Sequence, residues 1–209
     1  LTAVTTVKNI FDLNGAFGGP LKKDTVWFFT AHRRWGNENY QAGLFFSKDP
    51  LAWVNTPDLT RQAYEHNLHR SNSGRLTWQV NQKNKLSLAF DRQDQCICYT
   101  GLGSYGSVNA SPEAATFTHS FPNSYGQLKW SNAVSNKLLL EAGTSYNMMN
   151  WNSRPEAGVG PDVISVTELS SNRVYRAPSS FTGWEMRQAA YSRAFFQTAT
   201  LSYVTGAHA

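Results

Sequence analysis

Alternation of apolar and polar side chains is the dominant pattern along this chain. Residues 75–80 and 85–91 both place apolar side chains at even positions and mostly polar ones at odd positions. A period of two is typical of β-strands, and the polar connection at 81–84 predicts a hairpin between them. The apolar positions are Leu76, Trp78, Val80, Leu86, Leu88 and Phe90.

The same pattern of alternating segments joined by polar turns recurs elsewhere and predicts an all-β, antiparallel, up-and-down fold of about seven strands. A second hairpin turns near Ser135, and an earlier pair of strands is joined through residues 20–25. The remaining pattern predicts a last strand over 191–204. The other strands are expected at about 9–19, 26–35, 126–131 and 138–146.

Short and long connections alternate along the chain. Three connections are short, whereas three segments rich in Gly, Pro, Ser and Asn show no persistent period. Short turns at one end and long loops at the other are typical of outer-membrane barrels, with the short turns periplasmic. The pattern therefore predicts transmembrane β-barrel strands of roughly 9 to 13 residues, forming a partial barrel with long extracellular loops. These loops are expected at about 36–70, 96–120 and 152–188.

Charged and aromatic positions agree with this interpretation. Lys129 and Glu141 fall in mid-strand on the face opposite the Leu and Trp side chains, where a watery lumen would solvate them. Arg75 and Gln79 share this expected lumen face. Aromatic residues near strand ends are interpreted as interfacial girdles, with ordinary core aromatics as the alternative. They are Trp27, Trp35, Trp78, Trp130, Tyr146 and Trp151.

Composition narrows the classes of protein. Of 209 residues, 41% are hydrophobic, 13% aromatic and only 16% charged, below the usual charge of about 25% in soluble domains. No apolar run approaches a transmembrane helix, and residues 1–10 show no signal peptide, so an exported form would be processed or truncated. The net charge of +5 is scattered, which argues against nucleic acid as a partner.

The two cysteines, Cys96 and Cys98, are too few for a disulfide framework. A C-x-C pair alone does not supply the four ligands of a tetrahedral zinc site. The favoured interpretation is a pair of loop cysteines that an oxidising compartment can cross-link.

Other candidate motifs carry no site. Residues 101–106 match G-x-G-x-x-G, but no helix is expected after them, so they are interpreted as a loop rather than a dinucleotide site. His66 and His69 would share a face if residues 61–70 were helical, but no third ligand is evident, so a solvated loop helix is preferred. The sequence therefore predicts no enzyme, no catalytic residue, no metal site and no cofactor.

One segment carries a family resemblance. Residues 14–24 read Asn-Gly-Ala-Phe-Gly-Gly-Pro-Leu-Lys-Lys-Asp, and Trp27, Phe28 and Phe29 follow. This closely resembles a hairpin of Oar-like TonB-dependent transporters, in which a Gly-Gly-Pro turn with basic and acidic residues leads into an aromatic strand. Residues 203–208 are similar to a later periplasmic turn of the same proteins.

The resemblance implies a transport receptor in the outer membrane of a Gram-negative bacterium. Its partners would be outer-membrane lipid, the TonB–ExbB–ExbD complex and a scarce solute such as a siderophore, glycan or peptide. Its barrel of about 22 strands would be closed by a plug. With no plug-like segment or TonB box visible, residues 1–209 are expected to be part of the barrel domain. The alternative is a soluble or cell-surface β-rich binding module.

Overall fold

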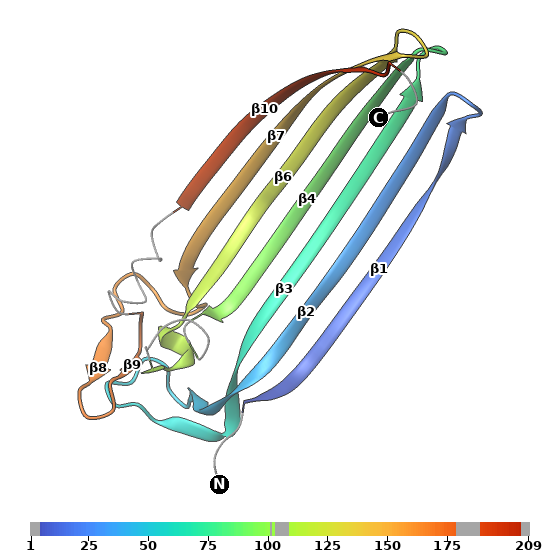
Figure 1. Cartoon of the computed structure of the whole chain (residues 1–209). Coiled ribbons are helices and arrows are strands. Elements are labelled where there is room, and N and C mark those ends of the chain that lie inside the picture. The colour runs from blue at the N-terminus through green and yellow to red at the C-terminus, as the bar shows by residue number, and fades with distance from the viewer. Residues whose placement is uncertain (1–4, 101, 103–108, 179–188, 206–209) are drawn as a thin grey trace.

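The computed structural model describes residues 5–100, 102, 109–178 and 189–205 (Figure 1). Seven long strands form one antiparallel sheet in the order β1-β2-β3-β4-β6-β7-β10. Neighbours in this sheet follow one another along the chain, so the predicted all-β, antiparallel, up-and-down arrangement is confirmed. The long strands are β1 (Thr6–Lys22), β2 (Val26–Ser47), β3 (Pro57–Gln79), β4 (Asn84–Thr100), β6 (Thr116–Ala133), β7 (Leu138–Pro155) and β10 (Ala189–Tyr203).

The three predicted short turns lie together at one end of the sheet (Figure 1). They span residues 23–25, 80–83 and 134–137. In the first, Asp24 has a φ of 57°, a conformation that Asp tolerates better than most residues, and the Thr25 amide donates to the Lys22 carbonyl over 3.1 Å. The predicted asymmetry between a short-turn end and a loop end is confirmed.

The strands are longer than predicted and the loops correspondingly shorter. The seven strands have 15 to 23 residues each rather than 9 to 13. Most of the expected loop 36–70 is strand, because β2 runs to Ser47 and β3 begins at Pro57. A helix at 61–70 is therefore wrong. Toward the loop end both faces carry polar side chains, so the backbone ladder continues where the alternation used for prediction has ended.

Cross-strand register gathers the alternating side chains into rows. Leu76 lies opposite Leu88, and Leu88 lies opposite Leu128, so one face carries a continuous apolar row across three strands. These side chains are not packed in a core, since Leu88 is 53% and Phe90 is 51% exposed. The described chain thus presents an apolar sheet face with nothing over it.

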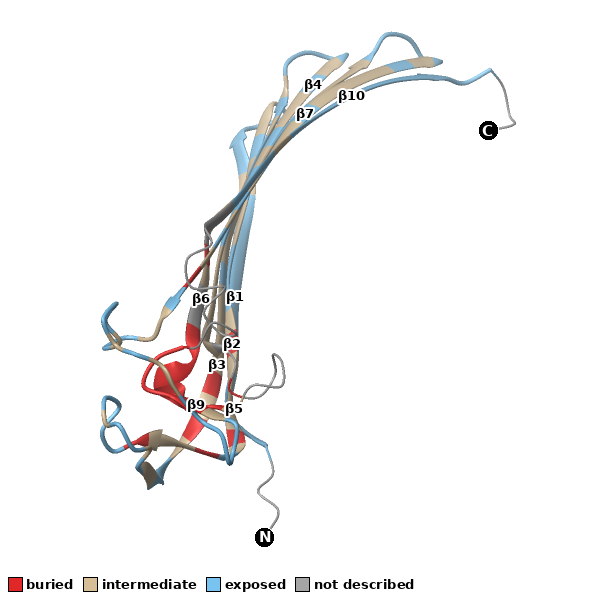
Figure 2. Cartoon of the chain, turned by 90° about the vertical axis from the view of Figure 1, so that its left-hand side faces the viewer, coloured by how far each residue is buried: buried red, intermediate tan, exposed pale blue. Residues whose placement is uncertain are grey.

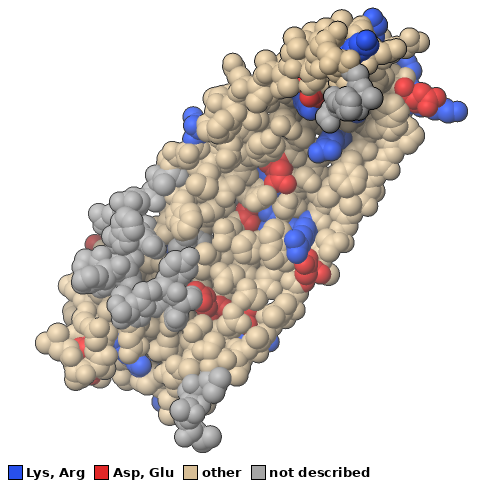
Figure 3. Space-filling view, viewed as in Figure 1, with Lys and Arg blue, Asp and Glu red and all other residues tan. Residues whose placement is uncertain are grey.

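The opposite face is polar, as predicted. The Lys129 ammonium and the Glu141 carboxylate form a salt bridge of 2.7 Å there, and Asp12 pairs with Arg33 on the same face. Positive and negative side chains are interspersed on the face shown in Figure 3, rather than gathered in patches of one sign. Such a surface suits contact with water.

On the central strands, the apolar character of the first face is concentrated in the half near the short turns. Farther along the same face, Arg70 pairs with Asp94 at 2.7 Å, and His32 contacts Asn72 at 2.9 Å. The apolar rows on β7 extend over residues 138–146, which corresponds to roughly 27 Å along a strand at about 3.3 Å per residue. Toward the loop end of the central strands both faces carry polar side chains, although Phe11 and Leu68 remain on the first face.

The aromatic residues divide between the two faces. Trp27 lies opposite Thr77, and Trp35 stacks on His69 with ring centroids 5.0 Å apart, both on the polar face. Trp151 has the same register parity. The girdle interpretation is therefore wrong for these three as outward-facing residues. Those on the apolar face are Trp78, Trp130 and Tyr146.

Burial is concentrated at the loop end (Figure 2). A 3₁₀ turn, η1 (Pro112–Ala114), packs there beside a small sheet of order β5-β9-β8. Tyr175 in this sheet donates its hydroxyl to the Trp53 carbonyl over 2.9 Å, which ties it to the β2–β3 connection. The small sheet comprises β5 (Asn109–Ala110), β8 (Val166–Glu168) and β9 (Arg173–Tyr175). No helix in the described ranges is long and apolar enough to cross a membrane.

Candidate functional site

A local irregularity shapes the loop end of β2 and β3. The β2–β3 ladder shifts register between Tyr40 and Phe45 and again between Phe45 and Ser47. Gly43, with a φ of 71°, lies within the first shift and occupies a region that non-glycine residues rarely adopt. Bulges of this kind re-aim side chains. Here they accompany a gathering of aromatic and basic residues.

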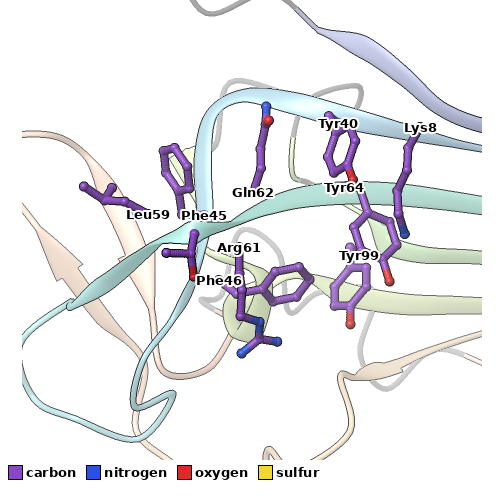
Figure 4. Close-up of a pocket in the computed structure, with 10 residues that line it drawn as sticks. Lys8, Tyr40, Phe45, Phe46, Leu59, Arg61, Gln62, Tyr64 and Tyr99 are labelled. Carbon is purple, nitrogen blue, oxygen red and sulfur yellow. The ribbon is translucent and has the colours of Figure 1, made fainter.

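These residues line a cavity of about 610 Å³, which we call the loop-end cavity. Its walls come from β1, β2, β3 and the end of β4 (Figure 4). Its size is within the range usual for small-molecule sites. The lining residues are Lys8, Tyr40, Phe45, Phe46, Leu59, Thr60, Arg61, Gln62, Tyr64 and Tyr99.

Aromatic rings form one continuous wall of the cavity. The Phe46 ring lies edge-on to those of Tyr64 and Tyr99, with centroid distances of 5.8 and 5.5 Å. Tyr64 and Tyr99 are 5.9 Å apart, and Tyr40 meets Tyr64 at 6.3 Å. Edge-to-face contacts at these distances are favourable and hold the rings in defined orientations. The cavity therefore has a wall of mutually packed aromatic rings that carries phenolic groups.

Two cations flank this wall. The Lys8 ammonium lies 3.3 Å from the Tyr64 ring centroid and forms a 3.0 Å salt bridge with Glu38. The Arg61 guanidinium lies 5.0 Å from the Phe46 ring centroid. Within the described ranges, no carboxylate lies within 4.0 Å of the Arg61 guanidinium. Arg61 therefore keeps its hydrogen-bond donors available for an anion.

A second cavity of about 350 Å³ adjoins the first and shares Phe46, Arg61 and Tyr99 with it. On its wall, the Glu156 carboxylate accepts a 2.7 Å hydrogen bond from the Tyr99 amide. Burial raises the pKa of Glu156, and this hydrogen bond opposes the rise. Glu113 lines the same space and accepts hydrogen bonds from two serine hydroxyls.

The arrangement can bind a ligand that combines a flat ring with an anionic group. A flat ring can lie against the aromatic wall, and the planar Arg61 fork can hold an anionic oxygen beside it. The phenolic hydroxyls supply further donors and acceptors. The site therefore fits a flat, anionic, partly aromatic ligand.

The four residues expected on the lumen face lie elsewhere. Arg75, Gln79, Lys129 and Glu141 share the polar face of the sheet, as predicted, but none lines the loop-end cavity. The side-chain amide of Gln79 donates to the Asn81 carbonyl at the short turn over 2.7 Å, at the opposite end of the strand from the loops.

His66 and His69 do not share a face. Both lie in β3, and because side chains alternate along a strand, residues three apart point to opposite sides. His69 stacks on Trp35, whereas the His66 Nδ1 lies 4.0 Å from a Glu38 carboxylate oxygen. The alternative in which they share a metal-facing side required a helix, and the preferred loop helix is wrong for the same reason, since both residues lie in a strand.

Cys96 and Cys98 are joined by a disulfide, with Cα atoms 5.9 Å apart, so the favoured cross-link is present. Both lie in β4 rather than in a loop. Of the G-x-G-x-x-G segment, only Leu102 is described, and it is buried against Leu44 and Ala63. The remaining motif positions, 101 and 103–106, lie outside the described residues.

The loop-end cavity was not predicted from sequence. Its central residues fall in 40–64, within the segment for which the absence of alternation predicts a long loop. The available signal was a local density of aromatic residues around Arg61, without a spacing that would assign them to one surface. Register shifts decide that assignment, and they are a property of paired strands.

No known protein family, no curated protein and no solved structure matches this chain.

Proposed function

We propose that the chain is part of a transmembrane β-barrel of a bacterial outer-membrane transport receptor, of the TonB-dependent type, which takes up a scarce solute. In this proposal the apolar half-face contacts lipid, the opposite face lines a watery lumen, and the loop end is extracellular. The loop-end cavity then lies beyond the lipid, where Tyr40 and Tyr64 continue the face that carries the apolar rows.

The observation that carries the proposal is the exposed apolar face. Soluble monomers rarely expose contiguous apolar patches larger than a few hundred Å², yet Trp78, Leu88 and Leu128 are 45, 53 and 44% exposed in adjoining rows. At a strand tilt of about 40°, the apolar stretch of roughly 27 Å along β7 spans about 20 Å of depth, near the apolar band of about 25 Å in outer-membrane barrels.

Strand length also supports a membrane setting. A strand of 23 residues is about 76 Å long, far more than a hydrocarbon layer requires. The excess lies at the loop end, where ion pairs such as Arg70–Asp94 occupy the face that is apolar farther down. In the proposed orientation, these polar portions project from the outer leaflet into water.

A matched pair of labels tests the membrane part. Leu88 and Ser87 are neighbours in β4 that face opposite sides of the sheet. Each is changed to Cys in a background carrying Cys96→Ser and Cys98→Ser, labelled with an environment-sensitive fluorophore and reconstituted into phosphatidylcholine vesicles. We expect brominated lipid to quench the label at Leu88→Cys, and aqueous iodide to quench the label at Ser87→Cys.

The alternative, a soluble or cell-surface binding module, gives a different result. It predicts a monomeric, folded chain in plain buffer, with neither label responding to brominated lipid. Equal quenching of the two labels by lipid would also contradict the proposal, because the proposed environment changes from one residue to the next.

The transport part rests on the resemblance of residues 14–24 to Oar-like transporters. Its test is uptake of a radiolabelled ferric catecholate by cells expressing the receptor, with and without a functional TonB. We expect uptake to require TonB, whereas binding at the cell surface persists without it. Uptake that is independent of TonB would refute this part while leaving the membrane topology intact.

A further inference from the structure

The strand register places two histidines beside the two cysteines, although all four are scattered along the sequence. His66 in β3 lies directly opposite Cys98 in β4, and Cys96 lies directly opposite His119 in β6. Directly opposed residues of antiparallel strands project to the same face, with Cβ atoms about 4.5–5.5 Å apart. The four side chains therefore share one face of three adjacent strands.

We propose that opening the Cys96–Cys98 disulfide converts this cluster into a Cys₂His₂ site for a divalent transition metal such as Zn²⁺ or Co²⁺. Two thiolates and two imidazoles are a usual ligand set for tetrahedral zinc. In the structure as it stands the sulfur atoms are bonded to each other, and no group of three or more His, Cys, Asp or Glu among the described residues is arranged to hold a metal. While the disulfide is intact, its sulfur atoms are not thiolates and do not supply the two sulfur ligands.

Reduction leaves the ligands in place because the sheet, and not the disulfide, positions them. Residues two apart on a strand project to the same side, so the two thiols stay adjacent after the bond opens. Paired backbone on both sides holds β4, with β3 through Leu68 and His66 and with β6 through His119. Metal–sulfur and metal–nitrogen bonds of about 2.3 and 2.0–2.1 Å can then span the space between opposed side chains.

A carboxylate is placed to orient one of the imidazoles. The His66 Nδ1 lies 4.0 Å from a Glu38 oxygen, and Glu38 is held by the Lys8 ammonium at 3.0 Å. Metal-binding histidines commonly donate the other ring N–H to a carboxylate, which fixes the tautomer. An approach of about 1 Å would bring Nδ1–H within hydrogen-bond distance of Glu38 and leave the Nε2 atom of His66 to meet the metal.

A dithiol can act as the reductant that opens the Cys96–Cys98 disulfide. The dithiol gives two electrons and two protons to the disulfide and becomes a disulfide itself, leaving two thiols at Cys96 and Cys98. Binding of a divalent metal then releases the two thiol protons and forms two metal–thiolate bonds. The site lies on the same face as the apolar rows but farther toward the loop end, so in the proposed orientation this exchange takes place in water outside the lipid.

The test uses the whole chain in detergent micelles with Co²⁺ as the probe. The disulfide is opened with a phosphine, the phosphine is removed, and Co²⁺ is titrated into reduced and oxidised samples without oxygen. We expect one Co²⁺ per reduced chain, with thiolate-to-cobalt charge-transfer absorption and tetrahedral d–d bands. The oxidised chain, identical in sequence, should show neither.

Variants separate a four-ligand site from simple thiol binding. His66→Gln and His119→Gln should each weaken Co²⁺ binding at least tenfold, and Glu38→Gln should weaken it by about 10–100-fold. His69→Gln is the matched control, because it lies on the same strand and faces the other way. Far-ultraviolet circular dichroism verifies that each variant keeps its strands.

Three results would overturn the proposal. They are the absence of Co²⁺ binding after reduction, equal binding by the oxidised chain, and binding that both histidine variants leave unchanged.

Discussion

Replacing Leu128 by Lys should reveal whether the apolar face meets lipid. Leu128 occupies the middle of the apolar row, between Leu88 and Thr144 on the neighbouring strands. It lies four residues from Asn132, about 13 Å along the strand and, at a tilt of about 40°, about 10 Å in depth. In an apolar band of about 25 Å, this places the side chain close to the midplane.

A Lys at that depth destabilises a membrane barrel by about 2–4 kcal/mol. At about 1.4 kcal/mol per tenfold, Leu128→Lys should lower the folding equilibrium constant by roughly 30-fold to several hundred-fold. Gln127→Lys is the control, since Gln127 is the adjacent residue on the polar face, flanked by Ala89 and Ser145. There the ammonium stays in water, and the expected change is within about 0.5 kcal/mol.

The assay is reversible urea unfolding of the chain folded in phosphatidylcholine vesicles, followed by tryptophan fluorescence. The free energies of unfolding of the two variants are compared with that of the unaltered chain. If the two lysines lower this free energy equally, or if Leu128→Lys has no effect, the assignment of the face to lipid is refuted.

Three further changes test other parts of the structure. Gly18→Ala should destabilise the chain by about 1–3 kcal/mol in the same urea assay, because the added Cβ would come within 2.6 Å of a backbone carbonyl oxygen. Gly15→Ala is the control and should be tolerated, since a Cβ at Gly15 meets open space. Equal effects of the two substitutions would refute the close approach at Gly18. The raised pKa of Glu156 means that the folded state holds this proton more tightly than the unfolded chain, so protonated Glu156 favours folding below pH 4.5 and this contribution is lost as pH rises through the raised pKa. Glu156→Gln should therefore stabilise the loop end at neutral pH and flatten the pH dependence of its hydrogen exchange. An unchanged pH profile would contradict this prediction. Arg61→Gln should weaken the binding of 2,3-dihydroxybenzoate, a flat aromatic anion, by at least tenfold in calorimetry, and Arg61→Lys should have an intermediate effect. Undiminished binding would show that Arg61 does not contact the ligand.

The sequence alone was sufficient for the short-turn half of the sheet. There one face is apolar and the other polar, so the two-residue period reports directly on strands and on which side chains share a face. The positions of Lys129 and Glu141 opposite the leucine rows followed from this period, and their 2.7 Å salt bridge agrees with it. The short turns could also be predicted from the sequence, because polar residues, Pro and Asp are concentrated there.

Only the tertiary structure decided the loop half. Its strands have polar side chains on both faces and are maintained by backbone pairing, which leaves no period in the sequence. For the same reason the sequence predicts a loop helix where His66 and His69 lie in a strand, and a loop where the cysteines lie in β4. Which distant residues become neighbours, such as Cys96 with His119 or Tyr64 with Tyr99, depends on register and bulges between strands. Those are long-range properties that no local pattern contains.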